Sequence, residues 1–181
     1  MHAIGLIELN SIAVGVEVAD AMAKTAMVEI LTAKTVCPGK FITLIGGDVA
    51  AVRQAVGAGL EVLPETVVDH FVIPNVHPSV LPAISGGNAV DKVAAIGVIE
   101  TYSVATTIEA CDAAVKAAQV EPIRMHLAFG IGGKSYVVLT GDVADVDAAV
   151  EAGAAVASAK GCLVQCVVIP RPHRQIVEAL L

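Results

Sequence analysis

Ile-Gly-Leu-Ile-Glu at residues 4–8 returns 92 residues later as Ile-Gly-Val-Ile-Glu at residues 96–100. Three further pairs follow in the same order: Gly-Lys at 39–40 and 133–134, Gly-Asp-Val at 47–49 and 141–143, and Val-Ile-Pro-x-x-His at 72–77 and 168–173. Similarity that keeps its order along the chain marks a duplicated unit. The 181-residue sequence therefore predicts two domains, residues 1–88 and 89–181, with a turn-rich linker at 82–88 between the copies.

Each copy has the pattern of strand, helix, strand, strand, helix and strand. Hydrophobic periodicity and turn residues predict, in the first copy, strands at 4–8, 27–36, 41–45 and 67–73 and helices at 11–26 and 48–60. The two middle strands form a hairpin, which turns at 37–40 in the first copy and at 130–133 in the second. Such a mixture predicts an α+β fold with helices on an antiparallel sheet.

Several side chains have predicted structural roles in these elements. The first helix of each copy carries an apolar stripe, expected to be buried, at Ile12, Val16, Ala19, Ala23 and Ala26 and again at Val104, Ile108, Cys111, Val115 and Ala118. The pairs Asp20/Lys24 and Asp112/Lys116 have the i,i+4 spacing of ion pairs on the solvated side. Asp48 and Asp142 are expected to be N-caps, and Glu8 and Glu100 to serve as a cap or in an ion pair.

The composition excludes several classes of protein. A net charge of −7 argues against nucleic-acid binding, which needs a basic surface, and 56% hydrophobic residues exclude disorder. The longest stretch without charge or His, residues 78–90, is too short to span a membrane. We expect no signal peptide, and four Cys without a framework spacing suit a reducing cytosol. Because the apolar excess is mostly Ala and Val, we expect surface to be buried between chains.

A near match to a phosphate-binding loop is better explained as a hairpin turn. Residues 128–135 read Ala-Phe-Gly-Ile-Gly-Gly-Lys-Ser, but the strand-like Tyr-Val-Val-Leu follows where that mechanism needs a helix. His77 and His173 recur at equivalent places and indicate a duplicated structural or interface role rather than a metal site. Catalytic groupings of Ser, His, Asp or paired carboxylates are not evident, so we expect no enzyme.

The cysteines divide into two kinds. Cys111 lies on an apolar helix stripe, and Cys162 and Cys166 lie about 13 Å apart along a strand, which favours structural roles for all three. Cys37 lies on an exposed turn before Pro and Gly, where its thiolate could reach a metal. The alternative, an incidental surface thiol, stays open on chemistry alone.

The duplicated motifs together resemble the bacterial microcompartment shell proteins, over nearly the whole chain. The motifs are Ile-Gly-x-Ile-Glu, Asp-x-x-x-Lys on the first helix, Gly-Lys in the hairpin turn, Gly-Asp-Val before the second helix and Ile-Pro-Arg-Pro-His at the end. The tandem, non-permuted order is similar to the trimeric class of that family. The resemblance implies a flat homotrimer whose six domains form a pseudohexamer, tiling with neighbouring shell proteins into the wall of an organelle in the cytoplasm.

The resemblance also assigns roles to residues. It places the hairpin turns at the central pore, lined by Pro38, Gly39, Lys40, Gly130, Ile131, Gly132, Gly133, Lys134 and Ser135, and it places Lys24, Lys116 and Arg171 at the shell edge. The first copy departs from the edge pattern, since Asn75 stands at the position of Arg171. The resemblance implies one [4Fe-4S] cluster per trimer, ligated by Cys37 of three chains, so that electrons or clusters would cross the shell at this pore. An encapsulated or cytosolic redox protein would be the partner. A metal-free, metabolite-gating pore and a small-molecule-binding regulatory domain are the alternatives.

Overall fold

The computed structural model describes residues 3–86, 90 and 93–180, which form two compact units. Unit 1 comprises Met1–Val76 with Ser103–Ala105 and Ala128–Gly133; unit 2 comprises His77–Tyr102, Thr106–Leu127 and Lys134–Leu181. Two short segments of the second sequence copy therefore belong to unit 1. The predicted boundary between residues 88 and 89 lies outside the described residues.

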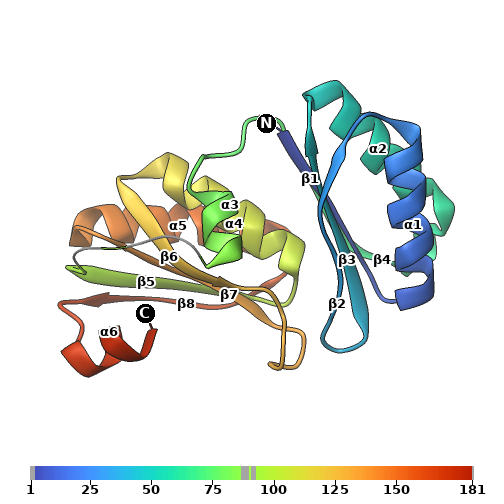
Figure 1. Ribbon diagram of the computed structural model, residues 1–181. Coiled ribbons are helices and arrows are strands. Elements are labelled where there is room, and N and C mark those ends of the chain that lie inside the picture. The colour runs from blue at the N-terminus through green and yellow to red at the C-terminus, as the bar shows by residue number, and fades with distance from the viewer. Residues whose placement is uncertain (1–2, 87–89, 91–92, 181) are drawn as a thin grey trace. The chain divides into compact units, whose positions relative to one another are not determined.

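Unit 1 is a four-stranded antiparallel sheet with two helices on one of its sides (Figure 1). The strands run in the order β2-β3-β1-β4. Its elements are β1 (Ala3–Leu9), α1 (Ile12–Thr25), β2 (Glu29–Val36), β3 (Lys40–Gly47), α2 (Val49–Val62), the 3₁₀ turn η1 (Pro64–Thr66) and β4 (Val67–Ile73). The predicted α+β fold and the element order of the first copy are confirmed.

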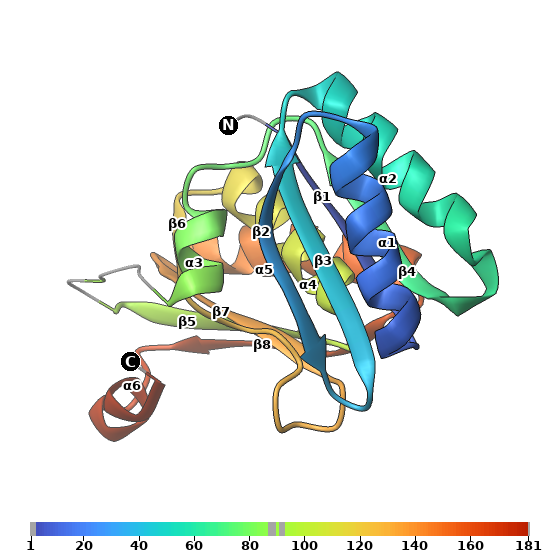
Figure 2. The same ribbon diagram turned by 45° about the vertical axis from the view of Figure 1, so that its right-hand side comes forward.

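Unit 2 repeats this sheet in the order β6-β7-β5-β8. Its elements are α3 (Val80–Ser85), β5 (Ala95–Thr101), α4 (Val104–Ala117, whose first two residues belong to unit 1), β6 (Val120–His126), β7 (Ser135–Gly141), α5 (Val143–Ala159), β8 (Leu163–Pro170) and α6 (Arg174–Leu180). In Figures 1 and 2, α6 lies on the opposite side of this sheet from α4 and α5. No helix in the described ranges is long and apolar enough to cross a membrane.

The short helices α3 and α6 were not expected from the sequence. The segment 82–88, predicted as linker, begins inside α3, where Pro82 occupies the first turn and its missing N–H leaves no hydrogen bond unmade. The two equivalent histidines precede these helices in the same way. The His77 ring Nδ1 accepts the N–H of Ser79 at 3.3 Å, and His173 Nδ1 accepts the N–H of Gln175 at 3.3 Å. Of the two predicted roles, the duplicated structural one is supported by these equivalent hydrogen bonds.

The predicted apolar stripe holds for most of α4 but in α1 only for Ala19. Val104, Ile108 and Cys111 are fully buried in α4. In α1 Ala19 is buried as predicted, but the other buried positions are Gly15, Val18 and Met22, and Ile12 and Val16 are 45% and 58% exposed. Because α1 carries Ala and Val on several faces, the sequence offers little contrast between its inner and outer sides.

Two further local predictions need correction. Asp48 and Asp142 occupy the N-cap positions of α2 and α5, but neither side chain makes a cap hydrogen bond. Asp20 and Lys24 form the expected exposed ion pair at 2.6 Å. Asp112 also pairs with Lys116, but its side chain is only 9% exposed and also accepts the N–H of His77 at 2.8 Å. This aspartate therefore lies in the packed part of unit 2.

Glycines let the layers of each unit approach closely. A Cβ atom on Gly5 of β1 would lie 2.6 Å from the Val56 side chain, and one on the equivalent Gly97 of β5 would lie 2.5 Å from Val150. Between the helices of unit 2, a Cβ on Gly153 of α5 would lie 2.7 Å from the carbonyl oxygen of Ala110 in α4. The apolar core is therefore thin and depends on small residues at fixed places.

We predict that Gly153→Ala lowers the free energy of unfolding by about 1–3 kcal/mol, because α4 and α5 must move apart to admit one methyl group. The matched control is Gly57→Ala in α2, where the new Cβ would meet nothing within 4 Å. A solvent-facing helical Gly→Ala change should instead stabilise by about 0.5–1 kcal/mol. Urea unfolding of both variants measures the difference, and equal effects would contradict the close packing described.

Candidate functional site

The turn between β2 and β3 presents the candidate metal ligand. Cys37, Pro38 and Gly39 connect the two strands as a tight turn, as predicted. The thiol of Cys37 is free and partly exposed. A sulfur in this position is accessible, unlike a thiol that serves as core packing.

A loop from the second copy meets this turn within unit 1. The N–H of Cys37 donates to the carbonyl of Ala128 at 2.9 Å, and the N–H of Gly130 donates to the Cys37 sulfur at 3.3 Å. Gly133 has a φ of +86°, and a Cβ there would lie 2.5 Å from the Pro38 ring. The hairpin turns of the two sequence copies are therefore in contact. At their closest approach, beside Pro38, only a glycine fits at position 133.

The surroundings of Cys37 suit a metal-binding thiolate better than those of the other cysteines. An N–H group that donates to sulfur stabilises its negative charge. Cys111, by contrast, is fully buried, and burial together with the neighbouring carboxylate of Asp112 raises the pKa of its thiol far above the ordinary value. Cys162 donates its S–H to the carbonyl of Lys160 at 3.6 Å. Among the described residues, His, Cys, Asp and Glu form no cluster of three that could hold a metal ion within one chain.

Two residues predicted to line a pore are instead buried. Lys40 is 8% exposed and donates to Glu8, and Ser135 is fully buried at the start of β7. Within the chain these two side chains therefore offer little or no surface, and the pore lining as a whole stays a prediction. Lys134 keeps a 40% exposed side chain and pairs with Glu100 at 2.5 Å. Gly39, Gly130 and Gly132 remain open, since a Cβ on any of them would meet nothing within 4 Å.

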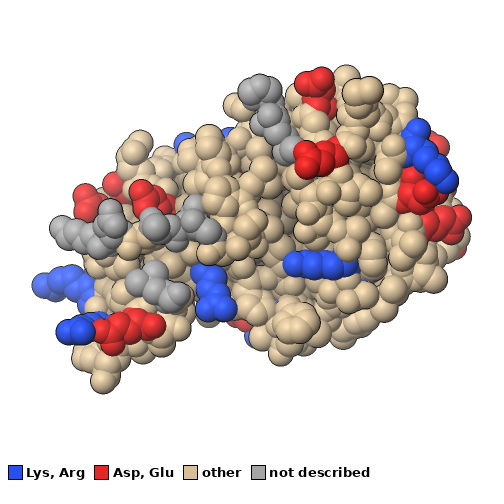
Figure 3. All heavy atoms as spheres, in the orientation of Figure 1, with Lys and Arg blue, Asp and Glu red and all other residues tan. Residues whose placement is uncertain are grey.

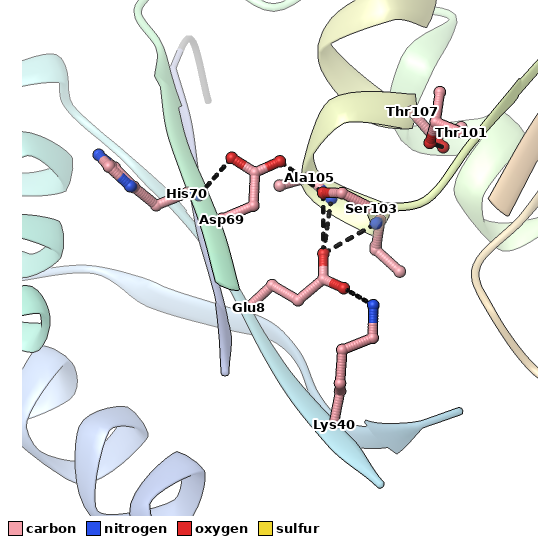
Figure 4. Close-up of polar contacts among 9 residues, drawn as sticks. Glu8, Lys40, Asp69, His70, Thr101, Ser103, Ala105 and Thr107 are labelled. Atoms are coloured by element: carbon pink, nitrogen blue, oxygen red, sulfur yellow. Dashed lines mark hydrogen bonds and ion pairs between the residues drawn. The ribbon is translucent and has the colours of Figure 1, made fainter. Parts of the chain in front are cut away.

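Glu8 is the centre of a buried polar network in unit 1 (Figure 4). Its carboxylate is completely buried and accepts from the Lys40 ammonium on one oxygen. The other oxygen accepts from the N–H groups of Val104 at 2.8 Å and Ala105 at 3.2 Å and from the Ser103 hydroxyl at 3.1 Å. The Ser103 hydroxyl also lies within hydrogen-bonding distance of the Asp69 carboxylate, so its one proton is shared between Glu8 and Asp69. The sequence predicted either a cap or an ion pair for Glu8. In the structure its carboxylate forms an ion pair and also caps the start of α4.

The comparisons with known proteins agree with this arrangement of two similar units. The model of the BMC domain matches residues 3–76 and again 95–172. The bacterial microcompartment shell protein PduT of Citrobacter freundii is 55% identical over 98% of this chain and 98% of its own length. The chain belongs to the BMC-domain family of microcompartment shell proteins.

Two further relatives differ in how much of this chain they match, one copy or both. The shell protein EutM of Salmonella typhimurium is 45% identical over 46% of this chain and 85% of its own length, so it corresponds to about one copy. A crystal structure of a microcompartment protein from Desulfitobacterium hafniense DCB superposes with a TM-score of 0.88 at 52% identity, over 98% of this chain and 99% of that one. The tandem order predicted from the repeats is therefore shared by a solved protein. Membership of a shell family also sets aside the regulatory-domain alternative.

The three predicted edge residues of this BMC protein have exposed side chains. The Lys24 side chain is 74% exposed and that of Lys116 is 40% exposed. Arg171 follows β8 with a φ of +49°, and its N–H donates to the carbonyl of Ala94 at 3.0 Å. In Figure 3 the charged side chains form small separate patches on a mostly uncharged face.

We predict that Lys40→Ala lowers the free energy of unfolding by about 3 kcal/mol or more, because it leaves the buried Glu8 carboxylate without its cation. The control is Lys24→Ala, whose ion pair is exposed and contributes at most about 1 kcal/mol. Urea titration of both variants at the same protein concentration provides the comparison. A loss for Lys40→Ala no larger than that for Lys24→Ala would show that the network does not stabilise unit 1.

Proposed function

We propose that this shell protein is a homotrimer in which Cys37 of three chains holds one [4Fe-4S] cluster at a threefold pore. The observation that supports this proposal is the accessible Cys37 thiol, held on a tight turn with the Gly130 N–H donating to its sulfur at 3.3 Å. Neighbouring shell proteins surround the trimer in the wall.

The residues present fit such a group. Thiolates are the preferred protein ligands of iron–sulfur clusters, and hydrogen bonds to the sulfurs tune their reduction potentials. The Gly130 N–H supplies such a bond from a backbone that is already fixed by the Cys37 to Ala128 hydrogen bond. Gly130 and Gly39 add no bulk beside the sulfur, which leaves room for a cluster.

One thiolate per chain is too few for a cluster, and symmetry supplies the others. A cyclic trimer repeats every surface group three times around one axis. Three Cys37 side chains would then provide three of the four ligands, and water or an outside ligand would complete the set. The other cysteines are poorly suited, since the thiol of Cys111 is buried with a raised pKa.

A bound [4Fe-4S] cluster supplies one-electron transfer. In a shell wall, the Cys37 turn would hold such a group where it blocks the passage of metabolites while electrons cross. The chain's own residues would set the position, the access and the hydrogen bonding of the sulfurs. An encapsulated or cytosolic redox protein would exchange the electrons.

We predict that Cys37→Ser abolishes the visible absorption and the iron of the protein purified without air, while the oligomer stays folded. One four-iron cluster shared by three chains gives about 1.3 iron atoms per chain, whereas a site within each chain would give about 4. The matched control is Cys162→Ser, another partly exposed cysteine, which should keep the iron. Iron analysis, absorption spectra and light scattering measure these properties together.

The outcomes separate the alternatives. Iron retained by Cys37→Ser would refute the assignment of the ligand. A colourless, iron-free wild-type protein after anaerobic purification and cluster reconstitution would refute the cluster and favour a metal-free, metabolite-gating pore. A wild-type monomer at micromolar concentration would refute the trimer on which both depend.

We also predict that Lys24→Ala combined with Lys116→Ala abolishes extended sheets while the trimer persists. Each exposed charged contact contributes only about 0–1 kcal/mol, but a trimer repeats it around its rim. The control is Arg174→Ala, which removes a similarly exposed i,i+4 ion pair on α6. Electron microscopy compares the two-dimensional arrays, and arrays from the double variant as large as those of the wild type would exclude an edge role for these lysines.

A further inference from the structure

Glu100 and Lys134 in unit 2 repeat the Glu8 and Lys40 pair of unit 1. Glu8 and Glu100 end equivalent motifs, and the two lysines follow the hairpin turns of the two copies. The strand registers agree as well: Glu8 lies opposite Asp69 on β4, and Glu100 lies opposite Gln165 on β8. The two copies therefore offer the same pair on the same part of the same sheet.

The two pairs differ in what covers them. In unit 1 the start of α4 covers the pair, and the side chains of Glu8 and Lys40 are 0% and 10% exposed. In unit 2 the same pair is 28% and 40% exposed. The Glu100 carboxylate forms an ion pair with Lys134, and this contact raises the pKa of Lys134. The Glu100 carboxylate is thus partly exposed, whereas the start of α4 covers the equivalent carboxylate of Glu8.

The start of α1 has the complementary shape and polarity. Ser11, Ile12 and Ala13 are the first-copy counterparts of Ser103, Val104 and Ala105. The first turn of α1 contains no acidic residue, so its positive end has no carboxylate of its own. Beside it Ile12 and Val16 are 45% and 58% exposed, whereas their counterparts Val104 and Ile108 are fully buried.

We propose that the start of α1 docks on Glu100 of a second copy of this chain. The Glu100 carboxylate would accept the N–H groups of Ile12 and Ala13, as Glu8 accepts those of Val104 and Ala105 within the chain. Gln165 would lie beside Ser11 as Asp69 lies beside Ser103. The same contact would cover Ile12 and Val16.

The proposed interface joins two different surface patches of the chain. Glu100 and the start of α1 are different parts of one chain, so each protomer would donate one surface and accept the other. Such a heterologous interface closes into a trimeric ring when the rotation between neighbouring protomers is one third of a turn. The inference rests on the proposed homotrimer and names its interface. Within the chain, the start of α4 meets two carboxylates, those of Glu8 and Asp69. Between chains, the start of α1 would meet only the carboxylate of Glu100, because Gln165 is neutral.

Sedimentation analysis of two variants tests the interface from both sides. Glu100→Ala removes the acceptor and Val16→Glu places a charge on the exposed face of α1. Each should raise the dissociation constant of the oligomer by about tenfold or more. Glu109→Ala, from another partly exposed ion pair of unit 2, and Met27→Glu, at a 95% exposed apolar residue, are the matched controls and should not change it. Circular dichroism checks that every variant is folded.

Cross-linking tests the geometry directly. Ser11→Cys with Gln165→Cys, in a Cys166→Ser background, should give disulfide-linked oligomers up to a trimer on a non-reducing gel. Ser103→Cys with Asp69→Cys is the positive control, since those side chains touch within one chain and should link without raising the mass. A wild-type trimer that persists in both Glu100→Ala and Val16→Glu and gives no cross-link would overturn this interface while leaving the trimer standing. A wild-type monomer would overturn the proposed function itself.

Discussion

The buried carboxylate of Glu8 is the constraint on which much of the structure depends. A charge removed from water is tolerated only when a cation and hydrogen-bond donors replace its hydration. Lys40 supplies the cation, and the backbone of Val104 and Ala105 supplies donors from the positive end of a helix. Those donors lie 96 and 97 residues from Glu8 in the sequence. The requirement of one side chain therefore ties the start of the second copy into unit 1.

Small residues set the second constraint. The repeated contact of Gly5 with Val56, and of Gly97 with Val150, allows each sheet to lie close to its helix. Units built in this way contain little aromatic bulk, in keeping with an aromatic content of 3%. A thin core also leaves apolar helix faces such as that of Ile12 and Val16 at the surface. Burial that the single chain does not complete is available for contacts between chains.

The sequence predicted the features that depend on local patterns. The hairpin turn at Cys37 and the strand Val67–Ile73 agree with the structure because turn residues and runs of β-branched residues act over a few positions. The buried face of α1 and the burial of Lys40 were not foreseen. The first fails because Ala and Val occupy several faces of α1. The second depends on Glu8, a partner 32 residues away that only the paired strands bring near.

Duplication also explains why the two hairpin turns can differ. In a ring of six identical domains, a cysteine on the turn would place six thiolates around the axis. A tandem chain carries Cys37 on one turn and a glycine-rich loop on the other, so the proposed trimer would present three thiolates that alternate with three loops. Three thiolates leave one iron of a four-iron cluster open to an outside ligand. The Gly130 N–H that donates to the Cys37 sulfur comes from the loop of the second copy, so each copy would have a separate part in the proposed cluster site.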